Sequence, residues 1–331
     1  MPNGAADHVV ANAGAAGDTV AMNDKIPLLI DTDPGVDDAL ALLLAFDDTN
    51  HDVVGLTIAA GNVGLRHTVA NALKLCEVAG REVPVYAGSP SPLLHAAPDA
   101  AYVHGNDGFG DIDYAPAARS AEAEHAALAI LRLSHVHAGK LVLVALGPLT
   151  NVALALKLDP TLPARVARFV AMSGAVTGHG NITPSAEFNA YFDPEAAKIV
   201  FDAFPQFDLS DWEATVAHGL PHDAVLGWMQ SGGEVGRFYE AISRKTREWS
   251  ADRRGDDWHC ADALAMAWVL EPDAAIEVAA RPLDVVLEHG AARGATVVDW
   301  QRQLGRPDNA RILMRYDAAR FHARIRRALT P

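Results

Sequence analysis

The segment at residues 31–38, DTDPGVDD, places four carboxylates within eight residues. Charges held so close together repel one another, and a following helix favours each acid at its amino end by only about 0.3–1 kcal/mol. Carboxylate oxygens are the ligands that hard cations such as Ca²⁺ and Mg²⁺ prefer. Because Pro34 fixes its φ angle and Gly35 can adopt torsions closed to other residues, we expect a rigid turn. The segment predicts a metal or polar-ligand site, with helix capping by Asp37 and Asp38 in a solvated turn as the alternative.

The elements around this segment alternate between strands and helices. Short apolar strands are expected at 26–30, 52–59, 83–86, 141–146 and 168–172, and helices at 39–46, 68–79, 121–136 and from 149. Nearly continuous apolar strands separated by helices predict an α/β fold, with a mostly parallel central sheet covered by helices on both faces in a Rossmann-like core. Ligands bind such sheets at the carboxyl ends of the strands, where the acidic segment lies.

The second half of the chain is less regular. We expect helices at 195–203, 234–249 and 261–270, a strand at 206–210 and, within 295–329, two strands and a closing helix. The loop at 88–116 has little periodicity and is expected to be functional. Because the sequence contains no internal repeat and no linker-like stretch, residues 25–331 are expected to form one domain after a flexible tail at 1–24.

The composition restricts the partners and the compartment. Half of the 331 residues are hydrophobic, and 42 acidic against 27 basic residues give a net charge of −15. A surface this acidic repels phosphate backbones and anionic lipids, so we expect neither a nucleic-acid nor a membrane partner. The two cysteines, Cys76 and Cys260, fit no metal or redox spacing and favour a reducing cytoplasm.

The run at 31–39, DTDPGVDDA, resembles the motif of the inosine-uridine preferring nucleoside hydrolases. Further stretches keep the family's order between about Ile26 and Pro272: Ala60-Gly-Asn62, His104-Gly-Asn-Asp-Gly108, Ala145-Leu-Gly-Pro-Leu-Thr-Asn151, Gly180-Asn181, Glu187-Phe-Asn189 with 193–197 (DPEAA), and Asp262. The resemblance implies the fold of that family and hydrolysis of the N-glycosidic bond of ribonucleosides to free base and ribose. It also implies a homodimer or homotetramer.

The same resemblance implies a set of site residues. A Ca²⁺ ion would be held by the side chains of Asp33, Asp38 and Asp262 and by the backbone carbonyl of Leu146. The ion would bind the ribose diol and one water, and Asp33 would activate that water as general base. The residues expected to bind the nucleoside are Asp37, Asn62, His104, Asn181, Glu187 and Asn189. In this set, His104 could instead be structural, and Asn181 could belong only to a Gly-Asn turn.

One position departs from the family pattern. In well-known members a histidine directly before the last metal-binding aspartate protonates the leaving base, whereas Ala261 precedes Asp262 here. His259 could replace it if the helix extends that far back, since residues three apart share a helix face, or it could be an exposed loop residue. Other members stack the base between aromatic rings, a role open to Trp212, Trp249 and Trp258.

Two other functions fit part of the sequence. A haloacid-dehalogenase-type Mg²⁺ phosphatase also has Asp-x-Asp after its first strand, although it needs neither the Pro-Gly turn nor the second aspartate pair. A non-catalytic nucleoside- or ribose-binding protein would keep the sugar site without the acid, as Ala261 would allow.

Overall fold

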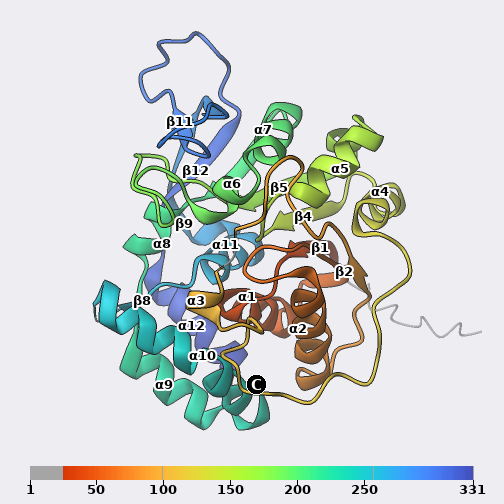
Figure 1. Cartoon of the computed structure of the whole chain (residues 1–331), viewed down its shortest axis with the longest axis vertical. Coiled ribbons are helices and arrows are strands. Elements are labelled where there is room, and N and C mark those ends of the chain that lie inside the picture. The colour runs from red at the N-terminus through yellow and green to blue at the C-terminus, as the bar shows by residue number, and fades with distance from the viewer. Residues whose placement is uncertain (1–24, 99, 256, 331) are drawn as a thin grey trace, which may run out of the picture.

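The computed structural model describes residues 25–98, 100–255 and 257–330, so the tail expected at 1–24 lies outside the described residues. The strands of its main sheet are β1 Ile26–Thr32, β2 His51–Ile58, β3 Val85–Ala87, β4 Leu141–Ala145, β5 Val166–Met172, β6 Phe207–Ser210, β9 Ala275–Arg281 and β12 Ala310–Tyr316. They are arranged in the order β3-β2-β1-β4-β5-β6-β12-β9 (Figure 1). Every neighbouring pair is parallel except β12 and β9. The predicted mostly parallel sheet is confirmed.

Side chains of the central strands alternate between two apolar layers, as the pleat requires. In β4, Val142 and Val144 pack with one layer, whereas Leu141 and Leu143 pack with the other. The first layer is formed by α1 Val36–Asp47, α2 Leu65–Val78, α9 His222–Ser231, α10 Gly233–Arg254, α11 Ala261–Leu270 and α12 Ala318–Leu329. The second is formed by α4 Ala126–Val136, α5 Thr150–Leu158 and α7 Pro194–Ala203. The prediction of helices on both faces is therefore confirmed.

Smaller elements complete the described part of the chain. These are α3 Ala101–His104, α6 Phe188–Phe192, α8 Trp212–Ala217, the 3₁₀ turns Leu162–Arg165 and Pro272–Ala274, and the pairs β7 Leu220–Pro221 with β8 Asp257–Trp258 and β10 Leu283–Val285 with β11 Thr296–Val298. None of the described helices combines the length and the apolar character needed to cross a membrane.

Several elements begin or end elsewhere than expected. The helix expected from residue 39 begins at Val36, because the Asp38 carboxylate accepts the Gly35 N–H and closes the first turn. The helix expected from 121 begins only at Ala126, after His125 as its N-cap. The strand β9 was not predicted, because this edge strand buries none of its side chains and has no apolar run.

Candidate active site

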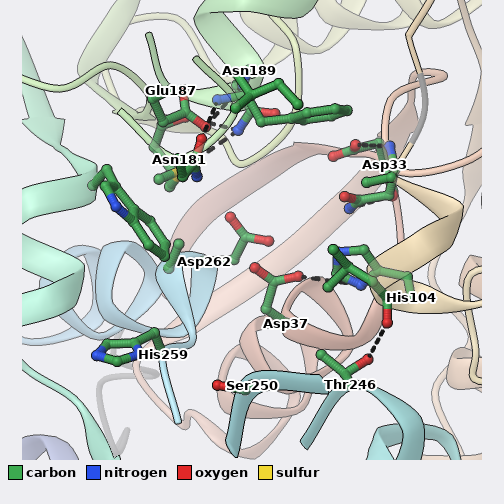
Figure 2. A pocket seen from close by; sticks show the side chains of 18 of the residues that line it. Asp33, Asp37, His104, Asn181, Glu187, Asn189, Thr246, Ser250, His259 and Asp262 are labelled. Carbon is green, nitrogen blue, oxygen red and sulfur yellow. Dashed lines mark hydrogen bonds and ion pairs between the residues drawn. The ribbon is translucent and has the colours of Figure 1, made fainter. Parts of the chain in front are cut away.

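A pocket opens at the carboxyl ends of β1, β4 and β5, the sheet edge expected to bind ligands. All predicted site residues except Asp38 line it (Figure 2). The lining residues among them are Asp33, Asp37, Asn62, His104, Leu146, Asn181, Glu187, Asn189, His259 and Asp262. Asp38 is fully buried below the pocket.

Asp38 organises the acidic segment that follows β1. One of its carboxylate oxygens accepts the Thr32 hydroxyl and the Asp33 N–H, the latter at 3.2 Å. The other accepts the Gly35 N–H at 3.0 Å and the Asn62 amide at 2.9 Å. These donors hold the turn rigid, as the sequence predicts.

Asp33 is enclosed by two glycines. Its Oδ2 accepts the Asn62 N–H at 2.7 Å. A Cβ at Gly61 would lie 2.0 Å from Asp33 Oδ2, and one at Gly147 would lie 2.2 Å from Oδ1. Both motifs therefore need glycine so that the backbone can approach this carboxylate. Burial, and then the charge of Asp38, raise the pKa of Asp33 well above its ordinary value.

Three carboxylates form a cluster suited to a metal ion. Oxygens of Asp37, Asp38 and Asp262 lie within 4.8 Å of one another. They come from the first turns of α1 and α11, and the carboxylates of Asp37 and Asp262 point toward one another (Figure 2). Burial, and then the charges of Asp37, Asp38 and Asp33, raise the pKa of Asp262 well above its ordinary value. None of the described residues that line the pocket is a lysine or an arginine, so a cation suits this donor set.

The cluster differs from the predicted ligand set in two respects. It contains Asp37, which we expected to bind the sugar, and it does not contain Asp33. The Leu146 carbonyl, expected to be a ligand, accepts the Asn189 amide at 2.6 Å. Asp38 and Asp262 belong to both sets.

The residues expected at the sugar are tightly bonded to the backbone. Glu187 is the N-cap of α6, and its carboxylate accepts the N–H groups of Gly174, Asn189 and Ala190. Burial, only partly offset by these donors, raises the pKa of Glu187 to about 7. The Asn181 side-chain oxygen accepts the Phe188 N–H at 2.8 Å. Both a capping and a sugar-binding role are compatible with this geometry.

His104, at the end of α3, is neutral. Its Nδ1 accepts the Val36 N–H at 3.1 Å, so the proton of the neutral ring is on Nε2. Burial lowers the pKa of His104 to about 4 although the Asp38 charge opposes this shift. The contact of 3.9 Å between Nδ1 and Asp37 Oδ1 is therefore not an ion pair.

Gly35 has a φ of −102°, so the expectation of special torsions there is wrong. Glycine is needed because a Cβ would lie 2.8 Å from both His104 and Asn62.

The base side of the pocket contains His259 and the three tryptophans. Because α11 begins at Ala261, His259 precedes the helix, and the suggested shared helix face with Asp262 is absent. Its ring nevertheless lines the pocket, with its centroid 6.2 Å from that of Trp212. Trp249 and Trp258 line the pocket as well.

Other lining residues were missed in the sequence analysis. Thr246 and Ser250 of α10 face the pocket, and their spacing of four residues within an amphipathic helix was the available signal. Tyr102 of α3 also lines the pocket, in a loop that was expected to be functional but had no distinctive motif there.

Comparisons with known proteins identify the family of this chain. The family model described as inosine-uridine preferring nucleoside hydrolase matches residues 28–323. The pyrimidine-specific ribonucleoside hydrolase RihB of Escherichia coli (strain K12 / DH10B) is 33% identical over 301 residues, 90% of this chain and 95% of RihB. The fold is similar to that of an inosine-guanosine nucleoside hydrolase, with a TM-score of 0.85, 29% identity, and coverage of 92% of this chain and 98% of the other. A purine-preferring ribonucleoside hydrolase from Gardnerella vaginalis has a TM-score of 0.85 at 28% identity, with the same coverage of both chains.

These similarities extend over nearly the whole described chain and include every motif that lines the pocket, which the phosphatase alternative does not explain. The chain belongs to the inosine-uridine preferring nucleoside hydrolase family, enzymes that cleave ribonucleosides into base and ribose.

Proposed function

We propose that this nucleoside hydrolase works with a Ca²⁺ ion held by the carboxylates of Asp33, Asp38 and Asp262 and by the Leu146 carbonyl. The observation that carries a cation at Asp38 and Asp262 is the approach of their oxygens and those of Asp37 to within 4.8 Å, in a pocket whose described lining contains no lysine or arginine. The family resemblance supplies Asp33 and the Leu146 carbonyl as the other two ligands. When bound, Ca²⁺ would supply a positive charge that binds the oxygens of the ribose diol and favours loss of a proton from a nearby water.

Asp33 is the proposed general base. It takes a proton from the water whose oxygen attacks the anomeric carbon, while the bond from that carbon to the base breaks. Asn62 N–H fixes one carboxylate oxygen, and Gly61 and Gly147 enclose the group.

The sugar is held by side chains that the protein has already oriented. We assign this role to Asp37, Asn62, Asn181, Glu187 and Asn189. The amide of Asn189 is fixed by the carbonyls of Leu146 and Met172, and Asn62 by Asp33 and Asp38. Such fixed geometry supports binding because few side-chain rotations are lost when the nucleoside enters.

The base lies between the two histidines and the tryptophans. Neutral His104 presents its Nε2–H as a donor, and His259 assists departure of the base beside Trp212. The aromatic lining supports stacking of the base, with Trp249 and Trp258 contributing faces or edges.

The proposal is tested by incubating the enzyme with inosine, adenosine, guanosine, uridine and cytidine, with and without a chelator, and measuring free base. We expect base release that the chelator abolishes and that added Ca²⁺ restores better than Mg²⁺. A rate independent of the chelator would contradict the metal mechanism.

We also propose that the enzyme is a cytoplasmic homodimer or homotetramer. Both described cysteines are free and buried, which supports a reducing compartment. Sedimentation of the purified protein checks the assembly, and a monomeric mass at micromolar concentration would contradict it.

A further inference from the structure

The loop between β5 and α6, residues 173–187, carries Asn181 and Ile182 into the pocket. Its first part is anchored by residues after β10. The Thr296 hydroxyl accepts the Ala175 N–H at 2.9 Å and donates to the Ala175 carbonyl at 3.0 Å. The indole N–H of Trp300 donates to the Val176 carbonyl at 3.1 Å. Up to Val176, the backbone therefore has little freedom.

Glu213, in the first turn of α8, holds the next part of the loop. Its Oε1 accepts the Thr177 N–H at 2.9 Å, the Thr177 hydroxyl at 2.7 Å and the His179 N–H at 3.2 Å. Its Oε2 accepts the Val176 N–H at 2.5 Å. One carboxylate thus accepts the N–H groups of Val176, Thr177 and His179, the last of which lies two residues before Asn181.

Asp211, the N-cap of α8, also accepts a hydrogen bond from this loop. Its Oδ1 caps α8 through the Ala214 N–H at 2.9 Å, and its Oδ2 shares the Val176 N–H at 3.1 Å. Burial, and then the nearby Glu213, raise the pKa of Asp211 well above its ordinary value. The pKa of Glu213 is lowered despite burial, because Asp211 and the loop donate hydrogen bonds to it. Asp211 and Glu213 thus both accept the Val176 N–H, which fixes the start of this stretch of the loop.

Among the described residues, His179 lies within ion-pair distance of this carboxylate. His179 has its Nδ1 3.8 Å from Glu213 Oε1, but its side chain is 83% exposed to solvent. Between the two acids, Trp212 points into the pocket. The start of α8 therefore contributes Trp212 to the pocket lining. Through Glu213 it also holds the loop that carries Asn181.

We propose that Glu213 is a positioning residue for nucleoside binding, fixing residues 176–179 and thereby the place of Asn181 in the pocket. The proposal rests on the sugar-binding role proposed above for Asn181. It assigns to Glu213 no contact with the nucleoside and no part in proton transfer.

A double-mutant cycle between Glu213→Ala and Asn181→Ala tests this role, with kcat and KM measured for the best nucleoside of the panel. We expect Glu213→Ala to lower kcat/KM about tenfold, mainly through KM, since it displaces a binding group. In the Asn181→Ala background the same change should alter kcat/KM by less than about twofold, because coupled residues are not additive. Glu213→Gln keeps the size of the side chain and serves if the alanine variant does not fold; it should show the same pattern with a smaller loss.

Glu124→Gln is the matched control, because it also removes a partly exposed carboxylate, 29% exposed and paired with Arg132, far from the loop. It should leave KM unchanged. Equal losses from Glu213→Ala in both backgrounds, or a change in melting temperature with no change in KM, would overturn the positioning role. If Asn181→Ala alone has no effect while Glu213→Ala raises KM, the proposed role of Asn181 is wrong, and Glu213 acts on another part of the pocket.

Discussion

The two ends of α1 both contain a pair of adjacent aspartates, yet their surroundings differ completely. At the amino end, Asp37 and Asp38 approach Asp262. At the carboxyl end, Asp47 pairs with Arg327, and Asp48 lies 3.0 Å from Arg324. One end of the helix gathers like charges, and the other end pairs opposite charges.

The pKa values follow this difference. Although burial opposes it, hydrogen bonds from His51 and Arg324 hold the pKa of Asp48 below its ordinary value. Burial and the charge of Asp37 raise the pKa of Asp38. A fold that pairs its buried acids with arginine at one end could have done so at the other. The amino end is therefore suited to a cation, because no lysine or arginine is among the described residues that line the pocket.

The largest expected effect is on catalysis at the amino end. Asp33→Ala removes the proposed general base and should lower kcat by about 10²–10⁴-fold. Asp47→Ala, at the other end of α1, should leave kcat within about twofold, because a surface pair contributes little. Steady-state release of free base measures both variants. Nearly normal turnover by the Asp33→Ala enzyme would show that Asp33 is not the general base.

At the carboxyl end of α1, we expect substitutions to lower the stability of the fold and not the activity. Arg324→Ala leaves Asp48 buried without its arginine and should lower the free energy of unfolding by about 3–5 kcal/mol, as breaking a buried pair does. The folded fraction should keep its kcat/KM. Arg327→Ala is the control: its side chain is 53% exposed, so we expect a loss below about 1 kcal/mol. Urea denaturation measures both, and similar losses would show that burial of the pair is unimportant.

The pH dependence of stability should reveal the contribution of the Asp48 carboxylate to folding. A carboxylate whose folded pKa is below its ordinary 3.8 stabilises the fold above that pH, and this contribution disappears as the pH falls through the folded value. The stability difference between wild type and Asp48→Asn should therefore be largest near neutral pH and shrink below about pH 4. A constant difference down to pH 2 would contradict this prediction.

The smallest effect is expected at the base side of the pocket. His259→Ala should slow hydrolysis by about tenfold or less, and mainly for nucleosides whose base is a poor leaving group. The control His135→Ala removes a histidine that is 63% exposed outside the pocket and should change nothing. An unchanged rate of His259→Ala on the whole panel would exclude an acid role for this residue.

Most of the sheet and the acidic segment were predicted from local patterns, whereas the other pocket residues were expected from the family resemblance. The apolar strand before Asp31 and the glycines beside Asp33 are visible in single short motifs. β9 was missed because an edge strand without buried side chains has no apolar pattern. Thr246 and Tyr102 were missed because only tertiary packing brings α10 against α3, where Thr246 donates to the Val103 carbonyl.

The burial and pKa of individual aspartates could not be predicted from the sequence, because these also depend on tertiary packing. Asp31 belongs to the motif but lies below the pocket, where Thr57 and Asn151 donate to it. Burial raises its pKa to about 7 against these donors. Its partners are 26 and 120 residues away in the chain, so no local pattern distinguishes it from Asp33.

The most direct test of the cation site is the anomalous difference density of crystals grown with Ca²⁺. The account predicts a peak between Asp38 and Asp262, bound also by Asp33 and the Leu146 carbonyl. Crystals in which Asp262 turns away from Asp38, with no peak between their carboxylates at saturating Ca²⁺, would contradict it.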